Sequence, residues 1–123
     1  MEHKIWYDDE HQLIRIKIKG DYTTEETLNH GKIAIELLEG KPYRQMIVDL
    51  FEFGNMESRE TRSASNKMLN QAGITDVAYV GANAAARMIA KVLMKLGSLK
   101  AEADFFKTFD EAVKWIDKRR EKK

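Results

Sequence analysis

The chain has no cysteine and only one proline, and these scarcities narrow what it can be. Without cysteine it forms no disulfide and offers no thiol nucleophile or thiolate metal site, which fits a reducing compartment. No apolar run approaches the roughly 18 residues that cross a bilayer. Residues 1–4 lead into a strand-like run instead of an apolar signal segment. We therefore expect a cytoplasmic protein without stable membrane insertion.

Charge of one sign is not in excess either. Lysine and arginine number 21 and aspartate and glutamate 20, which gives a formal net charge of +1. Such a balance creates no long-range field that would concentrate nucleic acid or anionic lipid. Nucleic acid is therefore not an expected partner.

Length and composition indicate one globular domain. The 123 residues are 43% hydrophobic and 33% charged, within the range of chains that fold on their own. This length is close to the commonest domain size and too short for two ordinary domains. We expect a single domain over residues 1–123.

The spacing of apolar residues predicts nine elements. Strands are expected at residues 3–7, 13–19, 46–50, 76–81 and 104–107. Helices are expected from Thr23 or Thr24 to residue 38, over residues 57–72 and 82–96, and after Thr108. A short polar turn makes the first two strands a hairpin, and helical crossovers make the others parallel. The predicted fold class is therefore α/β, in the order ββαβαβαβα: a mixed, mostly parallel sheet of about five strands, flanked by four helices.

The same pattern predicts which side chains face the core. The second strand alternates three apolar side chains toward it: Ile14, Ile16 and Ile18. In the first helix the predicted face consists of Leu28, Ile35 and Leu38. Residues 51–58 are expected to form a loop, and the helix that follows has few large apolar residues and so buries only a thin face.

Candidate binding residues gather where the parallel strands end. Ligands in such sheets bind beyond the carboxyl ends of the strands, where helix N-termini present free N–H groups. This edge should carry three features: Gly20-Asp21-Tyr22-Thr23, the loop at residues 51–58, and the turn at Gly81-Ala82-Asn83 with Arg87 one helical turn further. The Gly81 turn is either a plain turn or an anion-contacting loop, since no glycine-rich phosphate motif accompanies it.

No pattern of catalytic or metal-binding residues is present. The three histidines, His3, His11 and His30, lack the short spacing of zinc sites. None of the serines sits in a nucleophile-elbow motif. The sequence therefore predicts no catalytic residue, no metal and no cofactor.

Three local patterns resemble a known family. They are Ile47-Val48-Asp49-Leu50, Val77-Ala78-Tyr79-Val80-Gly81, and an aromatic strand at Phe105-Phe106 followed by the helix Glu111-Ala112-Val113-Lys114-Trp115-Ile116. Together with the element order, they resemble the SpoIIAA-like branch of the STAS superfamily, whose best-known members are bacterial anti-sigma-factor antagonists. The resemblance covers nearly the whole chain.

The resemblance implies a bacterial regulatory module. In the antagonists, a serine in the loop after the central strand is phosphorylated, and Met56-Glu57-Ser58 occupies the matching place here. Ser58 is thus either a phosphorylation site or a plain helix cap. A phosphate would be favourable here because the N–H groups at a helix N-terminus are free to bind it.

We predict a non-catalytic module that binds a protein partner of unknown identity. The alternative is a small hydrophobic or anionic, lipid-like ligand bound at the carboxyl-end edge of the sheet. The predicted partner or ligand edge consists of Glu57, Ser58, Gly81, Asn83 and Arg87.

Overall fold

A computed structural model describes residues 3–56, 59–84, 87–88, 91 and 100–121. Its strands are β1 (Lys4–Asp8), β2 (Leu13–Tyr22), β3 (Gln45–Met56), β4 (Asp76–Val80) and β5 (Glu102–Phe106). Its helices are α1 (Thr24–Leu38), α2 (Arg59–Gln71) and α4 (Phe109–Glu121). In this described part, no helix has the length and apolarity that crossing a membrane requires.

The five strands form one sheet in chain order, β1-β2-β3-β4-β5. β1 pairs with β2 antiparallel, and the other three pairings are parallel. This confirms the predicted hairpin and the mixed, mostly parallel sheet. Three of the four predicted helices are described, and residues 82–96 lie mostly outside the described part. Within that range, Ala84, Arg87, Met88 and Lys91 have helical conformation.

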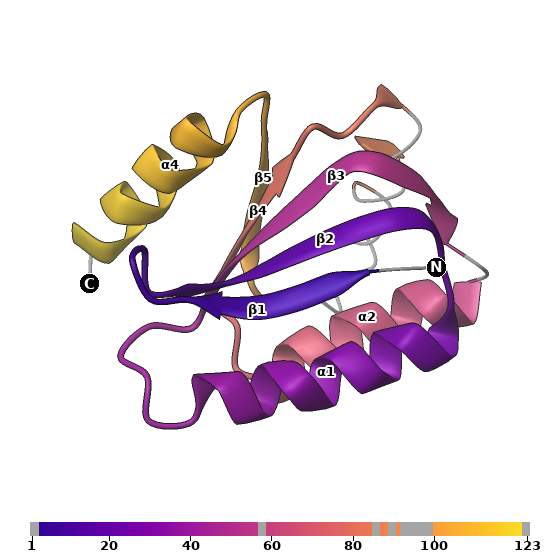
Figure 1. Cartoon of the computed structure of the whole chain (residues 1–123), viewed down its shortest axis with the longest axis horizontal. Coiled ribbons are helices and arrows are strands. Elements are labelled where there is room, and N and C mark those ends of the chain that lie inside the picture. Colours follow the sequence, from indigo (N-terminus) through magenta and orange to yellow (C-terminus); the bar gives the residue numbers. More distant parts are fainter. Residues whose placement is uncertain (1–2, 57–58, 85–86, 89–90, 92–99, 122–123) are drawn as a thin grey trace.

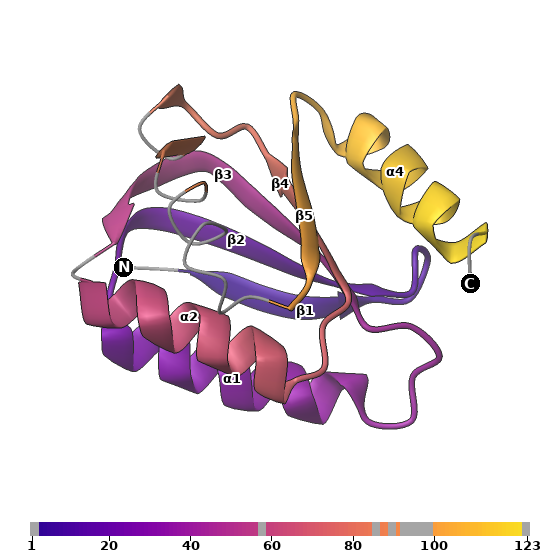
Figure 2. The same cartoon turned by 180° about the vertical axis from the view of Figure 1, so that it is seen from behind.

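The sheet separates two hydrophobic cores. α1 and α2 lie together on one face, and α4 lies on the other (Figures 1 and 2). The core on the α1 and α2 side includes the alternating isoleucines of β2, as predicted: Ile14, Ile16 and Ile18. The core under α4 is smaller and is built from Leu13, Ile47, Ala78, Val80, Ala112 and Ile116.

Helix α1 begins at the predicted cap, and of its predicted core face Leu38 is buried as expected, whereas Leu28 and Ile35 are exposed. The Thr23 hydroxyl accepts from the Glu26 N–H, and the Glu26 carboxylate accepts from the Thr23 N–H. Leu28 and Ile35, predicted to be in the core, are 40% and 41% exposed. The buried residues are Thr27, Gly31, Ala34 and Leu38. Three of these four residues are small, so α1 approaches the sheet and α2 closely. The larger side chains of Leu28 and Ile35 remain exposed.

Strand β3 is longer than predicted. The expected loop at residues 51–58 is wrong in its first part, because the strand continues to Met56. The reason is the length of β2, whose ladder with β3 continues through Gly20 opposite Phe53. A shift in register lies between the pairs at Lys17 and Lys19, and it lets both Leu50 and Phe53 reach the core under α1 and α2.

Helix α2 packs on α1 through a thin face, as the sequence predicted. Among its described side chains, Met68 is apolar and buried, and the polar Thr61 and Asn66 are buried with it; Ala72, directly after the helix, is also buried. The closest approach of the two helices is at Gly31, where an added Cβ would lie 2.2 Å from the Met68 side chain. A glycine at this position is therefore a requirement of packing.

Helix α4 is held to the amino ends of the central strands by polar contacts. The Asp76 carboxylate, fully buried, accepts from Arg119 Nε at 2.8 Å and from Gln45 Nε2 at 2.9 Å. Arg120 reaches further, to Gln45 Oε1 and to the His11 carbonyl in the turn between β1 and β2. These contacts fix the far end of α4 against the sheet.

Candidate functional site

The carboxyl-end edge of the sheet carries three of the five predicted site residues. Gly81 directly follows β4, and Asn83 and Arg87 come next, both exposed. The Arg87 N–H donates to the Asn83 carbonyl at 2.9 Å, which is the spacing of a first helical turn. Glu57 and Ser58 lie outside the described residues.

Gly81 adopts a conformation that favours glycine, with φ of +75°. Its N–H donates to the Phe106 carbonyl at 3.1 Å, which ties the turn to β5. An added Cβ would lie 2.5 Å from the Phe51 ring. Gly81 is thus required as a turn and as the support on which this ring lies.

Phe51 is a surface residue at a position where the sequence predicts a loop. It lies in β3 and is 63% exposed. Leu50 and Phe53 of the same strand are buried. The Phe51 N–H donates to the Asp49 carboxylate at 3.0 Å. Next to it, Lys17 and Glu52 form an ion pair at 3.4 Å. The edge therefore combines one exposed aromatic ring with a charged surround.

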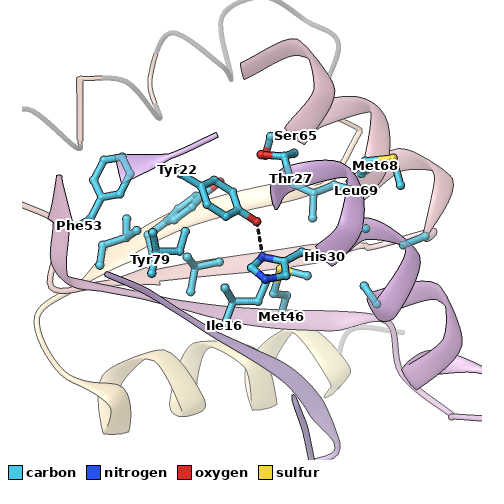
Figure 3. A pocket seen from close by; sticks show the side chains of 16 residues that line it. Ile16, Tyr22, Thr27, His30, Met46, Phe53, Ser65, Met68, Leu69 and Tyr79 are labelled. Atoms are coloured by element: carbon cyan, nitrogen blue, oxygen red, sulfur yellow. Dashed lines mark hydrogen bonds between the residues drawn. The ribbon is translucent and has the colours of Figure 1, made fainter. Parts of the chain in front are cut away.

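A small apolar cavity lies on the other face, between the sheet and helices α1 and α2 (Figure 3). Its volume is about 70 Å³. Aliphatic, aromatic and methionine side chains from β2, β3, α1 and α2 line most of it, among them Ile16, Met46, Phe53, Met68 and Leu69. Side chains with a polar group also border it: Tyr22, Thr27, His30, Ser65 and Tyr79.

Tyr22 and His30 join at this cavity. The Tyr22 hydroxyl and His30 Nδ1 are 2.6 Å apart, and their rings are stacked with centroids 5.5 Å apart (Figure 3). Burial raises the pKa of the Tyr22 hydroxyl well above its ordinary value, so the phenol stays neutral. Burial also lowers the pKa of His30, and the neighbouring His3 lowers it further.

His3 extends this cluster to the start of α1. Its side chain is 2% exposed, and its Nε2 lies 2.9 Å from Glu26 Oε2. Its Nδ1 accepts from the Lys19 N–H at 3.0 Å, which leaves Nε2 as the ring nitrogen that faces Glu26. Burial opposes ionisation of Glu26, yet hydrogen bonds from Thr23 and the proximity of His3 hold its pKa below the ordinary value. Sequence spacing alone could not have revealed this cluster, because β2, α1 and the residue before β1 supply it.

Acid should destabilise the fold through His30. Its pKa is below its ordinary value of 6.5 in the folded chain. The unfolded chain therefore binds more protons, and stability falls as the pH drops below about 6.5. Tyr22, His3 and Glu26 face this ring, and Glu26 titrates only at lower pH because its own pKa is lowered. We expect His30→Gln to flatten the dependence between about pH 7.5 and 5.5, measured by urea unfolding. An unchanged slope in this variant would contradict the assignment.

The turn between β1 and β2 offers the one group of potential metal ligands among the described residues. Ligand atoms of Asp8, Glu10 and His11 lie within 4.8 Å of one another. The Asp8 carboxylate already accepts from the His11 N–H at 3.1 Å and contacts its ring Nδ1 at 2.9 Å. Burial opposes ionisation of Asp8, but these hydrogen bonds outweigh it and lower its pKa. The arrangement stabilises a tight turn, and nothing else around it marks a metal site.

Comparison with known proteins identifies the architecture. The family model described as SpoIIAA-like matches residues 13–117. A solved structure of an uncharacterized DUF3478-family protein with a SpoIIAA-like fold, from Shewanella loihica PV-4, is 18% identical, with a TM-score of 0.66. The alignment covers 93% of this chain and 91% of that one.

The anti-sigma factor antagonist SpoIIAA, solved in its unphosphorylated form, is 9% identical, with a TM-score of 0.63. The alignment covers 97% of this chain and 98% of SpoIIAA. A comparison with proteins of curated function gives no match. The two structural likenesses show a shared fold, and the family match extends over most of the sequence. The chain belongs to the SpoIIAA-like family.

Proposed function

We propose that this protein is a non-catalytic regulatory module that binds another protein at the carboxyl-end edge of its sheet. The observation that carries the proposal is Phe51, a large aromatic side chain that is 63% exposed although it lies in a strand. An aromatic ring on a rigid support is a typical anchor of a protein interface, because little conformational entropy is lost when it is covered. The Gly81 backbone provides that support.

The surroundings of Phe51 are those of an interface rim. Lys17 and Glu52 are charged neighbours, and Asn83 and Arg87 follow the Gly81 turn with exposed side chains. Polar and charged groups around an apolar centre favour specific, reversible association. The likeness to SpoIIAA supports this class of function, since an anti-sigma factor antagonist acts on another protein.

The experiment compares two substitutions of exposed apolar residues. Phe51→Ser should lower recovery of the partner at least about ten-fold, as expected when an aromatic anchor worth about 1.4 kcal/mol or more is removed. Leu28→Ser is the matched control, because Leu28 is 40% exposed on α1, outside the proposed edge. Both variants should melt within a few degrees of the unchanged protein. Partner recovery is measured by quantitative pull-down from the source cells, and equal recovery with both variants would refute the edge.

Ser58 is proposed as the regulated position of the same surface. Ser58 directly precedes α2 in sequence. The description of SpoIIAA as solved in an unphosphorylated form supports control of this fold by a phosphate. In the same pull-down, Ser58→Asp should change partner recovery, because it adds negative charge at the edge. Ser63→Asp, at an exposed residue within α2, is the control and should leave recovery unchanged. If Ser58→Asp also leaves it unchanged, Ser58 is a plain cap.

A small hydrophobic ligand is the second candidate, and the apolar cavity favours it. Its volume of about 70 Å³ is well below the roughly 300–1,000 Å³ of sites for drug-sized ligands. A lipid-sized ligand would therefore require α2, with its thin buried face, to move away from α1. Native mass spectrometry after gentle purification tests this: a retained small molecule supports a carrier, and a clean mass of the protein alone removes that candidate.

A further inference from the structure

The outer edge of β1 is a second interaction surface, separate from the Phe51 edge. β1 is the outermost strand, and among the described residues β2 is its one strand partner. An edge strand presents unpaired backbone N–H and C=O groups to any strand that can lie alongside. Trp6, at the middle of β1, is 36% exposed. The edge thus combines backbone hydrogen-bonding capacity with an aromatic side chain.

The sequence of β1, Lys-Ile-Trp-Tyr-Asp, is complementary to itself when two copies run antiparallel. With Trp6 opposite Trp6 of a second copy, Lys4 lies opposite Asp8 at both ends, and Ile5 lies opposite Tyr7. Opposite charges and apolar pairs directly across two strands each stabilise the pairing. We propose that this protein forms a two-fold symmetric dimer in which the β1 strands of two copies pair edge to edge and join their sheets.

Asp8 keeps unused hydrogen-bonding capacity for this contact, although its side chain is only 11% exposed. Its carboxylate accepts from the His11 N–H and ring, and Arg15 Nη1 lies 3.8 Å away. A carboxylate has about four lone-pair sites, so an ammonium group from a second copy can still bind it. On the same face, the Arg15 guanidinium lies over the Trp6 ring at 5.1 Å, which orients the ring at the edge.

The helix layer fits the same symmetry. α1 packs against both β1 and β2. With strands about 4.8 Å apart, a helix centred between β1 and β2 lies about 10 Å from its symmetry mate, close to the distance at which helices pack. Ile33 is 37% exposed, and it lies on the side of α1 away from α2, about half a turn from Thr24, whose hydroxyl contacts Thr61 of α2. Ile33 would therefore be covered by the second copy.

A second copy suits this edge better than an unrelated strand. In the symmetric pairing, Lys4 of each copy lies opposite Asp8 of the other, so both charged ends are paired. The pairing also covers apolar side chains on both sides of the sheet, Trp6 on one side and Ile33 on the other. An isologous contact of this kind is closed, so it yields dimers and no fibres.

The first test measures mass in solution and adds a single thiol. Light scattering after size-exclusion chromatography should give twice the 14.2 kDa of the chain at high concentration. The chain has no cysteine, so Trp6→Cys introduces a unique thiol on the two-fold axis. Under mild oxidation we expect it to form a disulfide-linked dimer about ten-fold faster than Lys19→Cys, whose exposed residue lies on β2, because facing residues have Cβ atoms about 5 Å apart. Equal rates for the two variants would overturn the proposal.

The second test reverses one charge. Lys4→Glu places two acidic groups opposite one another at each end of the paired strands, and this should raise the dimer dissociation constant about ten-fold or more. Lys19→Glu makes the same charge change away from the edge and should not alter it. A chain that stays monomeric at all concentrations, or a dimer that Lys4→Glu leaves unchanged, would overturn the proposal.

Discussion

Gly31→Ala should lower the free energy of unfolding by about 2 kcal/mol, within the usual range for overpacking a close contact. Alanine ordinarily favours a helix over glycine by about 1 kcal/mol, so the expected sign is opposite to that of intrinsic propensity. The reason is the crossing of α1 and α2, where the new Cβ would lie 2.2 Å from one Met68 atom and 2.7 Å from two others. Urea unfolding monitored by circular dichroism measures the change.

A second substitution separates crowding from other effects at this crossing. If Met68 causes the loss, then Gly31→Ala introduced into a Met68→Ala chain should be neutral or stabilising, because the space is then open and the propensity of alanine dominates. Asn29→Ala, at an exposed position of the same helix, controls for changes in helix propensity alone. A destabilisation by Gly31→Ala that is equal with and without Met68 would contradict the packing argument.

The same crossing explains why the sequence predicted the extent of α1 correctly but its buried face only in part, at Leu38. The capping signals at Thr23 and Glu26 act locally, so they are legible in the sequence. The choice of face depends on how closely two helices and a sheet approach, and hydrophobicity alone gives Leu28 more weight than Gly31. Strand faces were easier, because alternation along β2 has one solution that buries Ile14, Ile16 and Ile18.

The candidate site, too, could be predicted from the sequence only in part. The rule that ligands gather beyond the carboxyl ends of parallel strands led to Gly81, Asn83 and Arg87, and these residues do follow the end of β4. Phe51 could not be predicted as an exposed strand residue, because a bulge opposite β2 sets its direction. The pairing of Tyr22 with His30 depends on how β2 leads into α1, which residue spacing does not specify.

Arg119→Ala should destabilise the protein by about 2 kcal/mol, because it leaves a buried carboxylate without its opposite charge. Asp76 is fully buried, whereas the Arg119 side chain is 31% exposed, so solvent reduces the expected loss below that of a fully buried pair. Gln45 and Thr75 continue to donate to the carboxylate and keep it partly satisfied. Lys118→Ala, at an exposed residue of the same helix, should change stability by no more than about 0.5 kcal/mol.

The Asp76 and Arg119 pair can be isolated by a double-mutant cycle. Asp76→Asn keeps the shape of the side chain and removes its charge, so Arg119→Ala should cost less in that background than in the unchanged chain. A coupling energy of about 1 kcal/mol or more is expected for a charged pair in direct contact. Chemical unfolding of the four proteins gives this value. Because Asp76 begins β4 and Arg119 lies near the end of α4, additive effects would mean that α4 is held by apolar packing of Ala112 and Ile116 and not by this ion pair.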